Sequence, residues 1–186
     1  RRLLVAPRGI RSKLLEKIDR EILFANSGQP AKIQMKLNAI LDEEFVEALY
    51  RASKAGVKID LIVRGICAIR AQVPNLSENI TVRSILGRFL EHSRIFNFHN
   101  GGDEEFFIGS ADLMDRNLNR RVESLVQINQ PSHKIFLADL LKRYLSDDVS
   151  CWKMNPDGKW QRVSKLPSAQ PLRDLQSETI EIYRVK

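Results

Sequence analysis

A histidine and an arginine lie two positions apart at the start of a segment with the composition of a β-strand. His92 and Arg94 precede the apolar residues of a strand predicted over 94–98, and alternate strand residues face the same side of a sheet. An imidazole can attack phosphorus, donate a proton to a leaving oxygen or donate a hydrogen bond, and a guanidinium neutralises anionic charge. The pair therefore suits work on a phosphoryl group, although such pairs also occur on ordinary protein surfaces.

A second anion-binding candidate follows the strand predicted over residues 57–63. Arg64 comes directly after this strand and is followed by Gly65. In open α/β sheets, ligands bind at the carboxyl ends of the strands, and a glycine there lets the backbone approach a ligand closely. An ordinary turn at the end of the strand is the alternative interpretation.

The strand predicted over residues 105–108 also ends in small and polar residues, which are Gly109, Ser110 and Asp112. Backbone N–H groups and a hydroxyl in such a turn can bind an anion. A loop whose polar groups satisfy one another is the alternative.

Two consecutive arginines, Arg120 and Arg121, stand at the start of a strand predicted over residues 121–128, which also contains a glutamate. Consecutive strand residues point in opposite directions, so we expect only one of Arg120 and Arg121 to reach a shared site. Glu123 lies two residues after Arg121 and therefore on the same face. Its carboxylate could orient an arginine or a histidine.

The positive charge of the chain is unevenly distributed. There are 30 Lys and Arg residues against 23 Asp and Glu, which gives a net charge of +7, and a solvated surface would explain this alone. Between residues 64 and 121, however, there are eight arginines and no lysine, and rigid guanidinium groups suit phosphates and carboxylates. These arginines are Arg64, Arg70, Arg83, Arg88, Arg94, Arg116, Arg120 and Arg121.

Several classes of protein are excluded or disfavoured by composition. No apolar run approaches the ~20 residues of a membrane span, and no signal peptide is recognisable at the start. Cys67 and Cys151 fit neither a disulfide framework nor a zinc site, which predicts a reducing compartment. Few aromatic residues interleave the basic ones, so a platform for stacking nucleic-acid bases is poorly supported. The chain begins without Met inside a strand-like segment, which we interpret as the start of a fragment.

The first half of the chain must position these groups through alternating strands and helices. Asp42 and Gly56 are suited to begin and end a helix between two strands. Ser12 is predicted to cap an earlier helix. The β–α–β–α–β order favours parallel strands with helical crossovers; its elements are strand 3–6, helix 13–26, strand 31–38, the helix between residues 42 and 56, and strand 57–63.

The second half is richer in strands, and Asn100-Gly101 marks a hairpin turn. We predict a domain over residues 1–150, followed by a small hairpin and tail over 151–186. The tail is predicted to be loop over 164–178 and a final strand or a disordered end over 179–185. The other predicted elements are strands 80–84, 94–98, 105–108 and 121–128, helix 133–146, and a hairpin turning at residues 155–158.

The histidine, glycine and serine motifs together resemble one half-site of the phospholipase D superfamily, whose pattern is His-x-Lys, then Asp, then Gly-Ser-x-Asn. Three positions depart from that pattern. Arg94 replaces the lysine, Asp112 replaces the asparagine, and His99 stands where the aspartate is usual. These departures count against an ordinary phosphodiesterase.

A narrower resemblance covers residues 3–163. This stretch resembles the C-terminal, second phospholipase-D-like domain of bacterial polyphosphate kinase. The matching segments are 3–7, 48–53, 56–67, 76–80, 87–96 and 116–123.

The resemblance implies an α/β fold: a phospholipase-D-like mixed sheet flanked by helices, in a single domain with a short C-terminal appendage. It implies reversible transfer of the γ-phosphate of ATP to polyphosphate through a phosphohistidine in an upstream domain. ADP is then the second nucleotide, and Mg²⁺ is bound mainly by that upstream domain. The isolated fragment would be inactive. The family also implies a homo-oligomeric enzyme in the cytoplasm, with the periphery of the inner membrane as a second location, and no nucleic-acid partner.

The resemblance also implies roles for individual residues. His92 matches a supporting histidine that binds the nucleotide phosphates or donates a proton. Arg64 and Arg121 match phosphate-binding arginines, and Arg88 and Arg94 would extend the path of the chain. Gly109, Ser110, Asp112 and Glu123 would support the site, with no metal ligand among them. Two alternatives remain: a phospholipase-D-type phosphodiesterase, and a non-catalytic module that binds polyanions.

Overall fold

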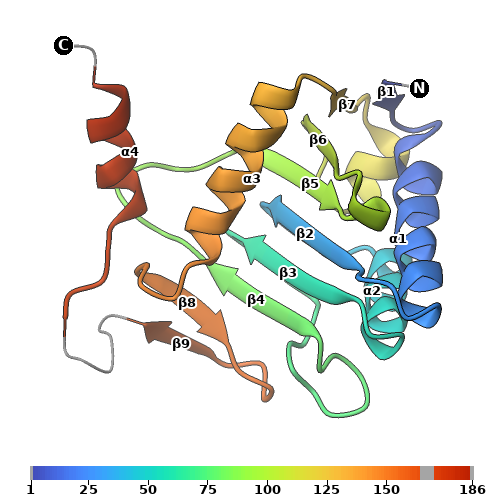
Figure 1. Ribbon diagram of the computed structural model, residues 1–186, viewed down its shortest axis with the longest axis horizontal. Helices are drawn as coiled ribbons and strands as arrows, with labels where there is room; N and C mark the ends of the chain where they lie inside the picture. Colours follow the sequence, from blue (N-terminus) through green and yellow to red (C-terminus); the bar gives the residue numbers. More distant parts are fainter. Residues whose placement is uncertain (1, 164–169, 185–186) are drawn as a thin grey trace.

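A mixed β-sheet forms the centre of the molecule (Figure 1). The computed structural model describes residues 2–163 and 170–184, and these residues form one nine-stranded sheet in the order β1-β7-β6-β5-β2-β3-β4-β8-β9. The strands are β1 (Leu3–Val5), β2 (Lys32–Leu37), β3 (Lys58–Val63), β4 (Ile80–Ser84), β5 (Arg94–Phe98), β6 (Glu105–Gly109), β7 (Ser124–Ile128), β8 (Cys151–Met154) and β9 (Trp160–Val163).

Three parallel strands, β2, β3 and β4, form the middle of the sheet. The crossover from β2 to β3 is α2 (Glu43–Lys54), whose ends are fixed by local chemistry. Asp42 caps its first turn by accepting a hydrogen bond from Phe45 N. After its last turn, Gly56 adopts a φ of +96°, a conformation that glycine takes without strain. The predicted β–α–β unit is therefore confirmed.

Helices cover both faces of this sheet. The helix α1 (Ile10–Asn26) and α2 lie over one face, and α3 (Pro131–Leu145) lies over the other (Figure 1). A hydrophobic core lies on each face of the sheet, and β5 contributes to both. Phe96 packs in the core on the side of α1 and α2, and Ile95 packs in the core on the side of α3. Burying a side chain of this size contributes about 1.5–3 kcal/mol, so β5 is held from both sides next to the predicted histidine motif.

Antiparallel strands extend the sheet at both edges. β5, β6, β7 and β1 continue it beyond β2. The hairpin of β8 and β9 pairs with β4 and continues the sheet at the other edge. The 3₁₀ turn η1 (Asn100–Gly102) joins β5 to β6, with Gly101 at a φ of +61°. The mixed sheet flanked by helices, the hairpin turn at Asn100-Gly101 and the C-terminal hairpin are as predicted.

Three predictions about single elements are wrong. The first helix begins at Ile10 with Gly9 at its cap, and the Ser12 hydroxyl donates to the Gly9 carbonyl instead of capping. β1 is antiparallel to β7 at the sheet edge and is not parallel to β2. The strand predicted over 121–128 begins only at Ser124.

The C-terminal segment also differs from its prediction. Residues 175–183 form a helix, α4 (Leu175–Tyr183), where we predicted loop up to residue 178 and then a strand or a disordered end. Residues 164–169 of the loop predicted over 164–178, and the end of the tail at 185–186, lie outside the described residues. None of the helices in the described part of the chain is long and apolar enough to cross a membrane.

Candidate functional site

The segments that follow β2, β3 and β6 meet at one end of the sheet, where these three strands stop; we call this end the edge at Arg64 and His92. Isolated parallel bridges join Ile40 to Cys67 and to Leu113. The backbone of Gly65 donates to the carbonyl of Asn38 at 2.9 Å, and a Cβ at position 65 would lie only 2.9 Å from that oxygen. The close approach that we predicted for this glycine is therefore made to the neighbouring strand end. The predicted segments after β3 and β6 thus meet at the carboxyl ends of their strands, and the His92 segment lies at the same end of the sheet because β5, which it precedes, is antiparallel to β2.

A buried ion pair joins two of these segments. Arg94 and Asp112 form a two-pronged contact, with Nη2 2.8 Å from Oδ2 and Nε 3.2 Å from Oδ1. Only 10% and 7% of the two side chains are exposed. The Asp112 carboxylate also accepts a hydrogen bond from the backbone N–H of Asn38 at 2.7 Å. Burial raises the pKa of Asp112, but the hydrogen bonds and the charge of Arg94 outweigh it, so the pKa lies below its ordinary value.

The same arginine holds the ring of the candidate histidine. Arg94 Nη1 lies 3.2 Å from His92 Nδ1 and donates to the His92 carbonyl at 2.9 Å. A guanidinium has donors and no acceptor, so Nδ1 must be the accepting nitrogen. The ring proton of the neutral imidazole then sits on Nε2. His92 is exposed, so this N–H can donate a hydrogen bond to a ligand.

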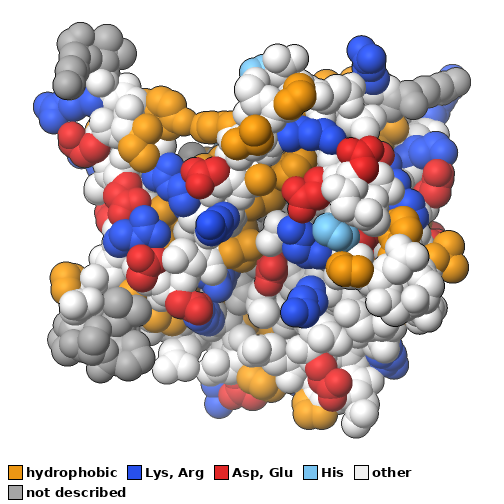
Figure 2. All heavy atoms as spheres, viewed as in Figure 1, with side chains coloured by type: hydrophobic (Ala, Val, Ile, Leu, Met, Phe, Trp, Pro, Cys, Tyr) orange, Lys and Arg blue, Asp and Glu red, His pale blue; other side chains and the backbone are white. Residues whose placement is uncertain are grey.

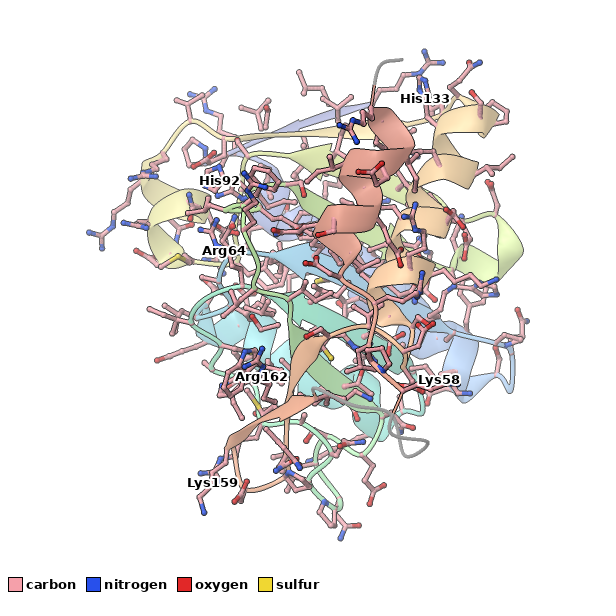
Figure 3. All side chains as sticks on the ribbon, turned by 90° about the vertical axis from the view of Figure 1, so that its left-hand side faces the viewer. Lys58, Arg64, His92, His133, Lys159 and Arg162 are labelled. Carbon is pink, nitrogen blue, oxygen red and sulfur yellow. The ribbon has the colours of Figure 1, made fainter. Side chains whose placement is uncertain are left out.

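Arg64 reaches the segment that carries the histidine. Its Nη1 donates to the carbonyl of Glu91 at 2.9 Å, one residue before His92. Figure 3 shows both side chains at the edge of the sheet where β3 ends and β5 begins. Arg64 and His92 therefore face one region of the surface, with Arg94 and Asp112 packed behind the histidine.

The predicted glycine and serine of β6 are engaged with β7. Ser110 N donates to the Ser124 carbonyl at 3.0 Å, and Ser110 Oγ accepts from Ser124 N at 3.1 Å. A Cβ on Gly109 would lie 1.9 Å from the Ser124 carbonyl oxygen. The N–H of Ser110 is therefore not free for an anion, whereas its hydroxyl hydrogen has no acceptor among the residues that the structure describes.

The consecutive arginines Arg120 and Arg121 lie outside any strand. Residues Arg116–Arg120 form a π-helical turn, η2, and Arg121 follows it in extended conformation with an exposed side chain. Arg120 pairs with Asp115 at 3.1 Å. Glu123 is buried and accepts from Asn117 Nδ2 at 2.6 Å. The structure thus uses this carboxylate to fix the π-helical turn, where we had expected it to orient an arginine or a histidine.

Not all the arginines of the central stretch serve this site. Arg83 is buried and donates to the carbonyls of Tyr144 and Ser146 at the end of α3, so it caps that helix. Arg88 is exposed, with its guanidinium 5.7 Å from the centre of the Phe89 ring. Anion binding therefore accounts for only some of the arginines between residues 64 and 121.

Two residues of the site had not been singled out from the sequence. Asn38 directly follows the parallel strand β2, where its N–H donates to Asp112, and the rule that ligands bind at strand ends could have identified it. Lys36 is buried inside β2, with Nζ 2.9 Å from Ser93 Oγ. Nothing in the local sequence distinguishes Lys36 from a surface lysine.

A hollow with a volume of about 920 Å³ lies between α3 and the sheet. Figure 2 shows basic and acidic side chains interspersed over this face of the molecule. Lys153 pairs with Asp147 at 2.7 Å and Lys32 with Glu104 at 2.9 Å. Because its charges largely offset one another, this hollow is a weaker candidate for an anion site than the edge at Arg64 and His92.

The fold defines the class of the protein. A phospholipase D family member, Nuc from Salmonella typhimurium, superposes with a TM-score of 0.54 at 17% identity, covering 87% of this chain and 97% of that one. The likeness shows a phospholipase-D-like fold.

The family follows from closer matches. The family model "Polyphosphate kinase C-terminal domain 2" matches residues 3–174, and the chain belongs to that family. Polyphosphate kinases from Streptomyces coelicolor and Mycobacterium avium are 51% and 48% identical over 99% of the chain, which spans 25% of each of those proteins. The crystal structure of polyphosphate kinase from Porphyromonas gingivalis superposes with a TM-score of 0.89 at 36% identity, covering 99% of this chain and 28% of that one.

Proposed function

We propose that this chain supplies one side of the active site of a polyphosphate kinase, which reversibly transfers the γ-phosphate of ATP to polyphosphate. The single observation that carries the proposal is the contact of Arg94 with His92 Nδ1, which leaves the Nε2–H of an exposed histidine beside Arg64 without a partner among the described residues. A fixed hydrogen-bond donor next to a cation suits a phosphate oxygen that gains charge.

In the proposed reaction, an upstream histidine attacks the γ-phosphorus of ATP. An N–P bond forms, the bond from the γ-phosphorus to the bridging oxygen breaks, and its electron pair passes to the terminal phosphate oxygen of ADP. His92 donates its Nε2 hydrogen bond to that oxygen. Polyphosphate then accepts the phosphoryl group in a second transfer.

The arginines divide into two roles in this proposal. Arg64 and Arg121 bind phosphate, and exposed Arg88 extends the path of the polyphosphate. Arg94 is a positioning residue, because its nitrogens already contact Asp112 and His92.

The residues present do not fit a Mg²⁺ site. Both oxygens of Asp112 accept hydrogen bonds from Arg94, and no cluster of three or more potential metal ligands occurs in the described segments. We propose that Mg²⁺ is bound by the upstream domain. Assembly as a homo-oligomer, a location in the cytoplasm or at the periphery of the inner membrane, and the absence of a nucleic-acid partner complete the proposal.

The test is polyphosphate synthesis by the full-length enzyme carrying His92→Ala. Removing one preorganised donor is expected to lower kcat about 10²–10³-fold. His133→Ala is the matched control, since His133 is exposed on α3 (Figure 3). Near-normal synthesis by His92→Ala at saturating ATP would overturn the role.

A phosphodiesterase is the second candidate, and the histidine geometry disfavours it. A nucleophilic histidine needs a lone pair on the exposed nitrogen, whereas here the exposed Nε2 carries the proton. We expect no hydrolysis of bis(p-nitrophenyl) phosphate by the chain alone. Turnover of ATP by the full-length enzyme, lowered about 10²–10³-fold by replacing His92, distinguishes the proposal from a non-catalytic polyanion-binding module.

A further inference from the structure

Beyond its first residue, the segment that carries His92 has little apolar packing of its own. It joins β4 to β5 over residues 85–93, and Figure 1 shows it passing beside α4. Ile85, its first residue, is buried in the core beneath α3, but Leu86, Phe89 and Leu90 are 59%, 51% and 73% exposed. Some other interaction must therefore fix the segment, which we call the histidine segment.

The carboxylate of Glu91 provides one anchor. Its Oε2 lies 3.1 Å from Lys36 Nζ and accepts a hydrogen bond from the hydroxyl of Tyr144, and its Oε1 accepts from Gln176 Nε2 at 3.1 Å. These partners come from β2, α3 and α4. Burial raises the pKa of Glu91, but Tyr144 and Lys36 outweigh it, and the net pKa is lowered. An ionised Glu91 thus ties the histidine segment to three elements.

Gln176 provides a second anchor. Its Oε1 accepts from Phe89 N at 2.7 Å, and its Nε2 donates to the Phe89 carbonyl at 2.9 Å. The amide therefore pairs with Phe89 as a neighbouring strand would. Only 7% of Gln176 is exposed, and a Cβ at Gly87 would lie 2.6 Å from its Oε1. The histidine segment is shaped to fit this one side chain.

The helix that carries Gln176 is itself firmly attached. Asp174 caps α4 by accepting from Gln176 N at 2.9 Å and from Ser177 N at 3.2 Å. Leu175 is buried in the core beneath α3. The match to the family model ends at residue 174, so the first buried turn of α4 lies beyond it.

We propose that Gln176 and Glu91 are positioning residues that hold the histidine segment in its active arrangement. The proposal rests on the proposed function of His92. Because Arg64 donates to the backbone carbonyl of Glu91, a displacement of Glu91 moves the arginine contact and the histidine together. The C-terminal helix is then a working part of the active site.

The first experiment compares Gln176→Ala with Ser177→Ala in the full-length enzyme. Ser177 lies in the same helical turn, and its hydroxyl contacts only Asp174 within the described residues. We expect Gln176→Ala to lower kcat about tenfold, the factor for one net hydrogen bond, with KM for ATP changed less than about twofold. The Phe89 amide should exchange hydrogen about tenfold faster, and Ser177→Ala should change neither quantity.

The second experiment uses Gln176→Glu, which keeps an acceptor for Phe89 N and loses the donor. Its carboxylate lies beside ionised Glu91, and two adjacent carboxylates repel more strongly as pH rises. The negative charge of Glu91 should raise the pKa of the new carboxyl, so activity relative to wild type should be highest at low pH and fall as pH rises and both groups ionise, whereas loss of the donor alone predicts no such slope.

Each outcome bears on the proposal. Faster exchange at Phe89 with unchanged kcat would overturn the positioning role and leave the proposed function intact. Unchanged exchange at Phe89 would overturn the anchor itself. Normal turnover by His92→Ala would instead refute the proposed function, whatever the exchange at Phe89 shows.

Discussion

Replacing Arg94 by lysine tests whether Arg94 orients the His92 ring, because the substitution keeps the positive charge and removes the planar guanidinium with its several donors. Arg94 donates to both oxygens of Asp112 and to the ring nitrogen and carbonyl of His92. A lysine ammonium is a single point of charge and cannot span both partners. We expect it to stay with Asp112, the buried carboxylate, and to lose both contacts with His92.

The magnitude follows from what those contacts do. Hydrogen bonds to charged groups are worth about 1.5–3 kcal/mol each. Once Nδ1 has no fixed donor, the ring can turn and exchange its proton between nitrogens, so the Nε2 donor is no longer preorganised. Losing most of one such donor corresponds to about 2.7 kcal/mol, or about 10²-fold in kcat.

The assay is steady-state polyphosphate synthesis by the full-length enzyme, with kcat and KM measured separately. Arg94→Lys should lower kcat about 10²-fold and change KM for ATP less than about threefold, because Arg64 and the net charge are retained. Arg116→Lys is the matched control, since Arg116 is exposed on η2. A folded Arg94→Lys enzyme with the kcat of the wild type would refute the reasoning.

Two further predictions concern stability. The pKa of Asp112 is lowered in the folded state, so the ionised carboxylate stabilises the fold above its ordinary pKa, and this stabilisation is lost as pH falls below about 4. In urea unfolding, the free energy of unfolding of Asp112→Asn should therefore depend less on pH in that range than that of the wild type. Equal pH dependence of the two proteins would contradict this. Gly109→Ala places a Cβ 1.9 Å from the Ser124 carbonyl and should lower the free energy of unfolding by about 3 kcal/mol, against about 1 kcal/mol for Ser110→Ala. A loss below about 1 kcal/mol for Gly109→Ala would show that β6 and β7 can separate freely.

Local chemistry made the β2–α2–β3 unit predictable. Asp42 and Gly56 mark the two ends of the helix, and its buried side chains recur at helical spacing. The position of β1 was not predictable in this way, because pairing with β7 is a contact between distant parts of the chain.

The C-terminal helix was missed for a different physical reason. Only Leu175 and Gln176 are buried in it, so no apolar stripe at helical spacing is present. Ile180 and Ile182 alternate as strand residues do, and both are exposed. Pattern analysis depends on burial of one face, and this helix buries only its first turn.

The candidate site was predictable in part. His92, Arg64 and Asp112 lie at one end of the sheet, because β3 and β6 end where antiparallel β5 begins, and the rule that ligands bind at the carboxyl ends of strands pointed to Arg64. The contacts of Asp112 with Arg94, and of Lys36 and Gln176 with Glu91, were not predictable. They depend on polar groups of distant elements being buried together. The sequence shows which residues could do chemistry, and the packing decides which of them face a ligand and which hold the others.

The most direct test of the central claim is the rate at which ATP phosphorylates the full-length enzyme in a single turnover, compared between wild type and His92→Ala. Our account predicts that the rate falls about 10²–10³-fold while ATP still binds through Arg64. An unchanged rate of phosphoenzyme formation would contradict the role of His92 and, with it, our interpretation of this edge of the sheet.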